Sequence, residues 1–165
     1  MGKICMFTGH RDLPAGTDGL RAALLRHITA LHADGYTDFL NGGAMGFDLL
    51  AAEAVLTLRP VLPGLRLLMI LPCYGQERAY TPADKRRYRA LLEQADLVRY
   101  TAHDYYRGCM LARDRVMAQA AHYCICYLTR STGGTAYTVR QCALRDVPIL
   151  NLAQTVSERT CHDLP

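Results

Sequence analysis

Short apolar runs alternate with amphipathic stretches along nearly the whole chain. Runs such as 4–8 and 65–71 are mostly apolar, which is typical of strands buried on both faces of a parallel sheet. Between such runs, stretches such as 20–33 place apolar residues three or four positions apart, as helices with one buried face do. The alternation predicts an α/β fold, a three-layer α/β/α sandwich with a mainly parallel sheet.

The boundaries of the individual elements follow from the same pattern. We expect strands at 4–8, 37–40, 65–71, 97–100, 123–128 and 148–152. We expect helices at 20–33, 48–58, 82–95, 104–121 and 135–144. Thr81 suits the N-cap of the third helix, and Pro82 suits its first position. The periodicity predicts one domain over residues 1–152 and a C-terminal tail over residues 153–165.

Composition narrows the class of protein. A chain of 165 residues, half of them hydrophobic, has enough apolar material for one real core. No apolar run approaches the roughly 20 residues of a membrane span, and the N-terminus lacks the features of a signal peptide. We therefore expect a cytoplasmic protein with no membrane partner.

The seven cysteines are odd in number and scattered, and no C-x-x-C pair occurs. This distribution favours buried, reduced thiols over a disulfide framework or a metal site, so we expect no metal. Lysine occurs only at positions 3 and 85, so 17 of the 19 basic residues are arginine. Arginine suits bidentate recognition of phosphate.

Glycine, hydroxyl and charged residues follow several of the predicted strands. The strand ends carry the segments Thr8-Gly9-His10-Arg11, Asn41-Gly42-Gly43, Pro72-Cys73-Tyr74 and Gly133-Gly134-Thr135. Because ligands of parallel α/β sheets bind outside the carboxyl ends of the strands, these segments should meet on one ligand-binding rim.

The stretch 41–48 is the first candidate on this rim. It runs from a strand through a glycine-rich turn into a helix, so the N–H groups of Gly42 to Gly46 could hold a phosphate. Tight packing without a ligand is the alternative explanation for these glycines, and a favourable place in the first helical turn is the alternative for Asp48. Neither the G-x-G-x-x-G fingerprint nor a P-loop occurs.

Gly133-Gly134-Thr135 is a second candidate, because it offers backbone N–H groups and a hydroxyl before a helix. Thr135 as a plain N-cap is the alternative. Arg113 would either project toward the rim or form a solvated ion pair with Asp114. After the third strand, Gln76 or Arg78 could cap a bound nucleotide, and four tyrosines could stack on a base or line the edge of the core: Tyr74, Tyr80, Tyr105 and Tyr106.

Taken in order, these segments resemble the SLOG superfamily of Rossmann-like proteins, and most closely its YpsA-like branch. The resemblance covers about residues 3–152. It rests on Thr8-Gly9-His10-Arg11, Asn41-Gly42-Gly43-Ala44-x-Gly46-x-Asp48, Leu71-Pro72-x-Tyr74-x-Gln76-Glu77, Arg113-Asp114-x-x-Met117 and Gly133-Gly134-Thr135-Ala136-Tyr137-Thr138. It implies a site for a nucleotide or a nucleotide-derived ligand, such as NAD or ADP-ribose, and by family analogy a homodimer.

The residues that catalysis needs in related enzymes match this sequence only in part. The related Lonely Guy enzymes cleave the N-glycosidic bond of nucleoside monophosphates and look to need an arginine in the Arg-Lys-x-x-Met helix and a glutamate three residues after Gly-Thr. Arg113 matches the arginine, but Thr138 stands at the glutamate position. Threonine cannot replace a carboxylate that stabilises an oxocarbenium-like sugar or activates water.

Three functional hypotheses follow. The first is nucleotide binding, as a sensor or in nucleotide metabolism. The second is an N-glycosidase (phosphoribohydrolase) in which Arg113 and Asp48 are catalytic. The third, by analogy with the DNA-processing protein A, is single-stranded DNA binding, which we rank last because the charge is mild and no basic stripe is evident. The predicted ligand-binding residues are Thr8, Gly9, His10, Arg11, Asn41, Gly42, Gly43, Ala44, Gly46, Asp48, Pro72, Gln76, Arg113, Gly133, Gly134 and Thr135.

Overall fold

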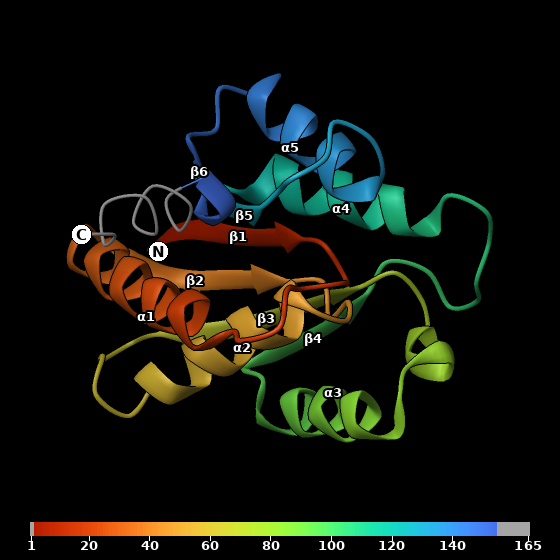
Figure 1. Cartoon of the computed structure of the whole chain (residues 1–165), viewed down its shortest axis with the longest axis horizontal. Coiled ribbons are helices and arrows are strands. Elements are labelled where there is room, and N and C mark those ends of the chain that lie inside the picture. Colours follow the sequence, from red (N-terminus) through yellow and green to blue (C-terminus); the bar gives the residue numbers. More distant parts are fainter. Residues whose placement is uncertain (1, 155–165) are drawn as a thin grey trace.

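A computed structural model describes residues 2–154 and shows a six-stranded, all-parallel sheet between two layers of helices (Figure 1). The strands are β1 (Lys3–Gly9), β2 (Tyr36–Asn41), β3 (Arg66–Leu71), β4 (Leu97–Tyr100), β5 (Tyr123–Tyr127) and β6 (Ile149–Asn151). The helices are α1 (Asp18–Ala33), α2 (Phe47–Leu58), α3 (Pro82–Gln94), α4 (Cys109–Ala120) and α5 (Gly134–Ala143), with a short 3-10 helix, η1 (Gln76–Ala79). The predicted three-layer sandwich is confirmed.

The strand order β4-β3-β2-β1-β5-β6 places the reversal of the sheet between β1 and β5. From β1 to β4 the chain moves outward in one direction, with α1, α2 and α3 on one face. It then crosses back to β5, and α4 and α5 cover the other face (Figure 1). Right-handed crossovers require this change of face when the direction of winding changes. The switch point therefore lies beyond the carboxyl ends of β1 and β5.

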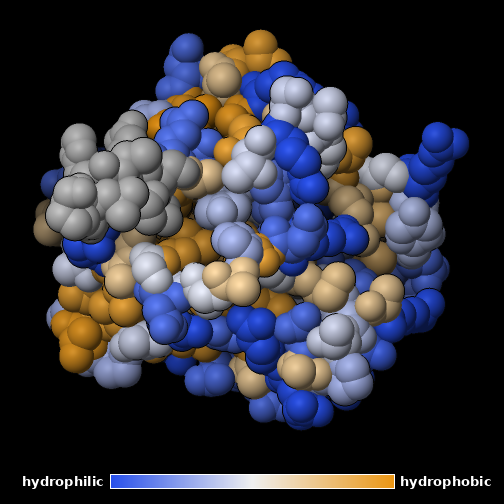
Figure 2. All heavy atoms as spheres, in the orientation of Figure 1, coloured by the Kyte–Doolittle hydropathy of each residue, from blue (hydrophilic) through white to orange (hydrophobic). Residues whose placement is uncertain are grey.

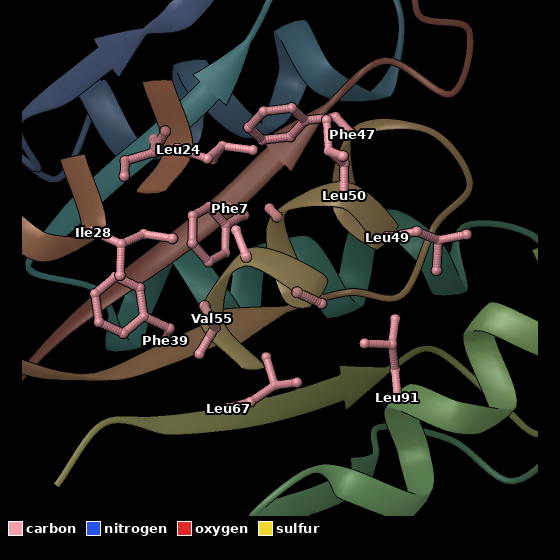
Figure 3. Close-up of a cluster of buried hydrophobic side chains, with 14 of the residues drawn as sticks. Phe7, Leu24, Ile28, Phe39, Phe47, Leu49, Leu50, Val55, Leu67 and Leu91 are labelled. Carbon is pink, nitrogen blue, oxygen red and sulfur yellow. The ribbon is translucent and has the colours of Figure 1, made fainter. Parts of the chain in front are cut away.

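Neighbouring residues of β1 point into two separate cores, as the pleat of a strand requires. Phe7 packs under α1 and α2, with its ring stacked on Phe39 at a centroid distance of 5.7 Å and edge-on to Phe47 at 6.4 Å (Figure 3). Met6 points to the opposite face and joins the sulfur-rich core beneath α4 and α5, where the Cys142 thiol lies 3.5 Å from its sulfur. The two cores fix the strand ends that form the rim.

One predicted boundary is wrong. The helix expected over residues 104–121 begins only at Cys109, because Gly108 adopts a left-handed conformation with φ 94° that interrupts helical geometry. Residues 101–108 instead form a loop in which Tyr105 and Tyr106 are exposed. The Thr81 cap is confirmed, since its hydroxyl oxygen accepts the Asp84 N–H at 3.2 Å.

Six cysteines lie within the described residues, and all six are buried and free, as predicted. Cys161 lies outside residues 2–154. The division into a domain at 1–152 and a tail at 153–165 stays a prediction, because residues 155–165 are not among those described. Across residues 2–154, each helix is too short or too polar to cross a membrane.

Candidate functional site

A pocket of about 240 Å³ opens at the switch point, between the ends of β1 and β5 and the inner side of α4. We call it the rim pocket. Figure 2 shows many hydrophilic residues on the side of the molecule toward which the strands point. The pocket is lined by residues 7–12, by Ala44 and Asp48, by Met110, Leu111, Arg113, Asp114 and Met117 of α4, and by Arg130 and residues 132–135. Two of the four predicted strand-end segments, 8–11 and 133–135, thus contribute to one site.

The N-terminus of α5 faces this pocket with its backbone uncovered. The N-cap, Gly133, has φ 96° and supplies no capping side chain, so the first N–H groups of the helix lack an intrahelical partner. A Cβ built on Gly133 or Gly134 would meet no atom within 4 Å. Thr135 is the second residue of the helix rather than its N-cap. This end of α5 therefore offers free donors and positive helix-dipole potential to an anion.

In the first glycine turn, other residues of the protein occupy the space next to the glycines. A Cβ on Gly42 would lie 2.5 Å from a guanidinium nitrogen of Arg113, and a Cβ on Gly46 would lie 2.2 Å from the Arg11 carbonyl oxygen. The Gly43 N–H donates to the buried amide oxygen of Asn41 at 2.8 Å, and the Asn41 amide nitrogen donates to the Asp48 carbonyl at 2.7 Å. Packing thus accounts for these residues.

Only Ala44 and Asp48 of the stretch 41–48 line the rim pocket. Two of the five N–H groups predicted to hold a phosphate, those of Gly43 and Ala44, already donate to side chains of the turn itself. The geometry therefore does not support the phosphate site expected on Gly42 to Gly46, although strand-to-helix connections of this kind bind anions elsewhere.

Asp48 is the chemically unusual group of the site. It is 5% exposed, and its Oδ2 accepts the Ala44 N–H at 3.2 Å. Its Oδ1 is buried and has no hydrogen-bond partner among the described residues. Burial raises the pKa of Asp48 to about 7, although the charge of Arg113 opposes the rise. The carboxyl group therefore titrates near neutral pH, where it can donate or accept a proton.

Arg113 is buried, which excludes the solvated ion pair considered from the sequence. Its guanidinium donates to Asp114 Oδ1 at 2.7 Å and to the Gly42 carbonyl, so it ties α4 to the end of β2. Burial by itself would lower the pKa of Arg113. The negative charges of Asp114 and Asp48 outweigh this effect, so the pKa of Arg113 is raised. A permanent buried cation thus faces the rim pocket beside Asp48.

Thr138 does not line the rim pocket. It is fully buried, and its hydroxyl lies 2.8 Å from the Gly134 carbonyl and 2.9 Å from Asp114 Oδ2. Asp114, which sequence reasoning did not select, lines the pocket at this point. The signal was available, because the spacing of Met110, Arg113, Asp114 and Met117 places all four on one face of a helix.

The His10 side chain contacts other parts of the protein and links two of its segments. It is 5% exposed, and its Nε2 accepts the Thr129 N–H at 2.9 Å. Burial lowers the pKa of His10, and the charge of Arg130, 3.1 Å from Nδ1, lowers it further. The ring thus joins the end of β1 to the loop that leads into α5. Arg130 was not predicted, because a lone loop arginine carries no sequence signal.

The remaining predicted residues divide between the pocket and its supports. Thr8 lines the rim pocket, and so does Gly9, where a Cβ would lie 2.4 Å from Phe47. Arg11 also lines it, and its guanidinium forms no hydrogen bond or ion pair within residues 2–154. Pro72 is buried and Gln76 donates from its amide nitrogen to the Gly42 carbonyl at 3.0 Å, and both lie outside the rim pocket.

The rim pocket therefore combines donors for an anion with the buried carboxyl group of Asp48, whose pKa is raised to about 7. The α5 N-terminus and Arg11 supply uncommitted donors, and Asp48 Oδ1 supplies a buried acceptor or, when protonated, a donor. The described residues contain no group of three histidine, cysteine, aspartate or glutamate side chains arranged to hold a metal ion. Such a site suits a ligand that carries both a phosphate and a hydroxyl group.

Sequence comparison identifies relatives of the chain. The YspA SLOG family, YpsA, matches residues 5–146. A UPF0398 protein of Bacillus pumilus (strain SAFR-032) is 32% identical over 114 residues, which is 64% of this chain and 61% of that protein. The UPF0398 protein YpsA of Bacillus subtilis (strain 168) is also 32% identical over 114 residues, 64% of this chain and 63% of the relative. In both cases the match spans less than two thirds of the relative's length.

Solved structures share the fold at lower identity. DNA processing protein A from Helicobacter pylori, for which a single-stranded DNA binding mode is described, superposes with a TM-score of 0.65 and 20% identity over 90% of this chain and 64% of that one. The protein TM1055 superposes with a TM-score of 0.59 and 19% identity over 94% of this chain and 81% of its own. These likenesses support the α/β architecture.

Proposed function

The chain belongs to the YspA SLOG family, and from that premise together with the rim pocket we propose that it binds a nucleotide or a nucleotide-derived ligand, as a sensor or in nucleotide metabolism. The phosphate lies on the N–H groups of Gly134 and Thr135, and Arg11 neutralises its charge. The ribose hydroxyls contact Asp48. Buried Arg113 holds the wall of the pocket and adds positive potential.

One observation carries this proposal: Asp48, whose buried Oδ1 has no hydrogen-bond partner among the described residues, lines the same pocket as the uncapped N-terminus of α5. An unsatisfied buried oxygen costs free energy unless something pairs with it. A sugar hydroxyl is a donor of suitable size, and a phosphate attached to the same sugar suits the helix N-terminus. Both groups occur together in nucleotides.

A ligand panel in a thermal-shift assay tests the proposal. AMP, NAD and ADP-ribose are compared with adenosine, which has the same sugar without the phosphate. We expect at least one phosphorylated ligand to raise the melting temperature by several degrees and adenosine to raise it much less, because a ligand that binds only the folded protein stabilises it. Equal effects of AMP and adenosine, or no effect of any phosphorylated ligand, would contradict the proposal.

Two glycine variants make the test specific. Gly134→Ala adds a methyl group to the open backbone of the pocket and should abolish most of the shift. Gly19→Ala is the matched control, because Gly19 lies in the first turn of α1, where an added Cβ also meets nothing within 4 Å, and outside the rim pocket. Loss of the shift in both variants, or in neither, would argue against the rim pocket as the site.

A second candidate function, an N-glycosidase acting on nucleoside monophosphates, is favoured by the titration of Asp48 near pH 7. A group with that pKa in a pocket is suited to general acid–base catalysis. Chromatography of nucleoside monophosphates incubated with the protein would detect the released base. Release that Asp48→Asn abolishes supports the enzyme, and no release from any nucleoside monophosphate rejects it. Arg113→Ala should also abolish activity.

Single-stranded DNA binding remains the third hypothesis. No feature of the described site adds support to it, and the likeness to DNA processing protein A concerns the fold at 20% identity. A gel shift at low salt tests it, because binding carried by phosphate contacts is strongest there. An unshifted oligonucleotide would reject this hypothesis.

A further inference from the structure

A second, larger cavity of about 530 Å³ adjoins the rim pocket. The two cavities share Arg11 and Met110 in their walls. The second cavity lies between the connection that follows β3 and the loop that leads into α4, and we call it the aromatic pocket. Its defining side chains are Tyr74, Gln76, Arg78 and Tyr105. The aromatic pocket therefore lies next to the proposed site of the sugar phosphate.

One wall of the aromatic pocket is an aromatic ring held in place. Tyr74 stacks on Tyr100 with a centroid distance of 3.8 Å and an interplanar angle of 14°. Its N–H donates to the His103 carbonyl at 3.1 Å, which ties the two loops of the pocket together. Tyr74 is nevertheless 52% exposed, and Tyr105, on the loop before α4, is 69% exposed. Exposed tyrosine faces in a cavity suit a flat aromatic ligand.

Two polar side chains of the pocket have unused hydrogen-bonding capacity. The Gln76 amide nitrogen faces the Gly42 carbonyl, which can only accept, so the orientation of the amide is fixed and its Oε1 remains an acceptor. Neither Oε1 nor the Arg78 guanidinium has a hydrogen-bond partner in the described part of the chain. An acceptor next to a donor matches the amine and ring nitrogens of an aminopurine.

We propose that the aromatic pocket is the base subsite of this protein and takes a flat heteroaromatic base with an exocyclic amine, such as adenine. The base stacks on Tyr105 and Tyr74, its amine donates to Gln76 Oε1, and a ring nitrogen accepts from Arg78. This inference rests on the proposed function for the position of the sugar phosphate. It adds the class of base and the residues that select it.

Calorimetry with three ligands tests the subsite: ribose 5-phosphate, AMP and IMP. IMP carries a carbonyl where AMP carries the amine. In the unmodified protein we expect AMP to bind at least about tenfold more tightly than ribose 5-phosphate, which is the size of effect that one stacked base gives. We expect IMP to bind more weakly than AMP, because its carbonyl would face the Gln76 oxygen.

Tyr105→Ala should remove most of the advantage of AMP over ribose 5-phosphate and leave the affinity for ribose 5-phosphate unchanged. Tyr106→Ala is the matched control, because Tyr106 is the next residue, is 50% exposed and does not line the aromatic pocket. It should change neither affinity. An AMP affinity equal to that of ribose 5-phosphate, or an advantage that survives Tyr105→Ala, would overturn the base subsite.

Failure of this inference can be told apart from failure of the proposed function. Ribose 5-phosphate that binds and is sensitive to Gly134→Ala, with no gain from the base, would retain the phosphate site and reject the base subsite. AMP that binds in a Tyr105-dependent manner but is insensitive to Gly134→Ala would support the base subsite and reject the phosphate position.

Discussion

At the scale of single residues, Asp48 joins the fold to the proposed function. The buried carboxyl group accepts one hydrogen bond and leaves Oδ1 unpaired among the described residues. An ionised carboxylate is costly to bury, even with Arg113 nearby, so the protein keeps the proton on Asp48 up to about pH 7. A ligand hydroxyl that pairs with Oδ1 would offset part of this cost.

Asp48 should make stability depend on pH. Between about pH 4 and pH 7 the unfolded chain releases the Asp48 proton while the folded protein retains it, so the free energy of unfolding falls as pH rises through this window and levels off above it. Asp48→Asn removes this contribution. Urea unfolding gives the free energy of unfolding of both proteins at each pH. We expect the wild type to lose on the order of 4 kcal/mol of stability relative to Asp48→Asn between the lower and the upper end of the window.

The control is Asp12→Asn, which changes an exposed carboxylate in the wall of the same pocket. Its effect on the free energy of unfolding should be small, because the ion pair that it removes, between Asp12 and Arg130 at 3.4 Å, is exposed. Parallel pH profiles for wild type and Asp48→Asn would show that folding does not raise the pKa of Asp48, and would remove the support for Asp48 as an acid or base that titrates near pH 7.

At the scale of elements, the two glycine turns look alike in sequence and differ in structure. Each follows a strand and opens a helix, yet Gly46 packs against the backbone of Arg11, and Gly134 faces an open pocket. Composition and spacing could not separate these cases, because the difference lies in which distant backbone approaches the turn. The late start of α4 has a comparable cause, since helical periodicity does not show that Gly108 adopts a positive φ.

Replacing glycine with alanine should destabilise the protein at Gly46 and have little effect on its stability at Gly134. Gly46 has φ 73°, and its added Cβ would overlap the Arg11 carbonyl, so we expect Gly46→Ala to lower the free energy of unfolding by at least about 2 kcal/mol. Gly134→Ala should change it by no more than about 0.5 kcal/mol, because the methyl group enters open space. Urea unfolding of both variants measures the difference. Equal losses would contradict the distinction drawn between the turns.

At the scale of the whole molecule, the apolar pattern predicts the architecture well. All six strands lie within one residue of their predicted limits. The four inner strands, β1, β2, β3 and β5, are largely buried, and strands buried on both faces leave the clearest signal in a sequence. The convergence of Thr8 and Gly134 on one edge followed from the strand-end rule. The contribution of Arg130 did not, because it depends on side-chain packing across the switch point.

The central claim is that a ligand phosphate lies on the N-terminus of α5 and not on the first glycine turn. Titration of ¹⁵N-labelled protein with AMP tests it most directly, because amide resonances report each turn separately. We predict the largest shifts for Gly134, Thr135 and Ala136, and little change for Gly43, whose N–H already donates to Asn41. Large shifts at Gly42 and Gly43 with unchanged resonances at 134–136 would contradict the claim.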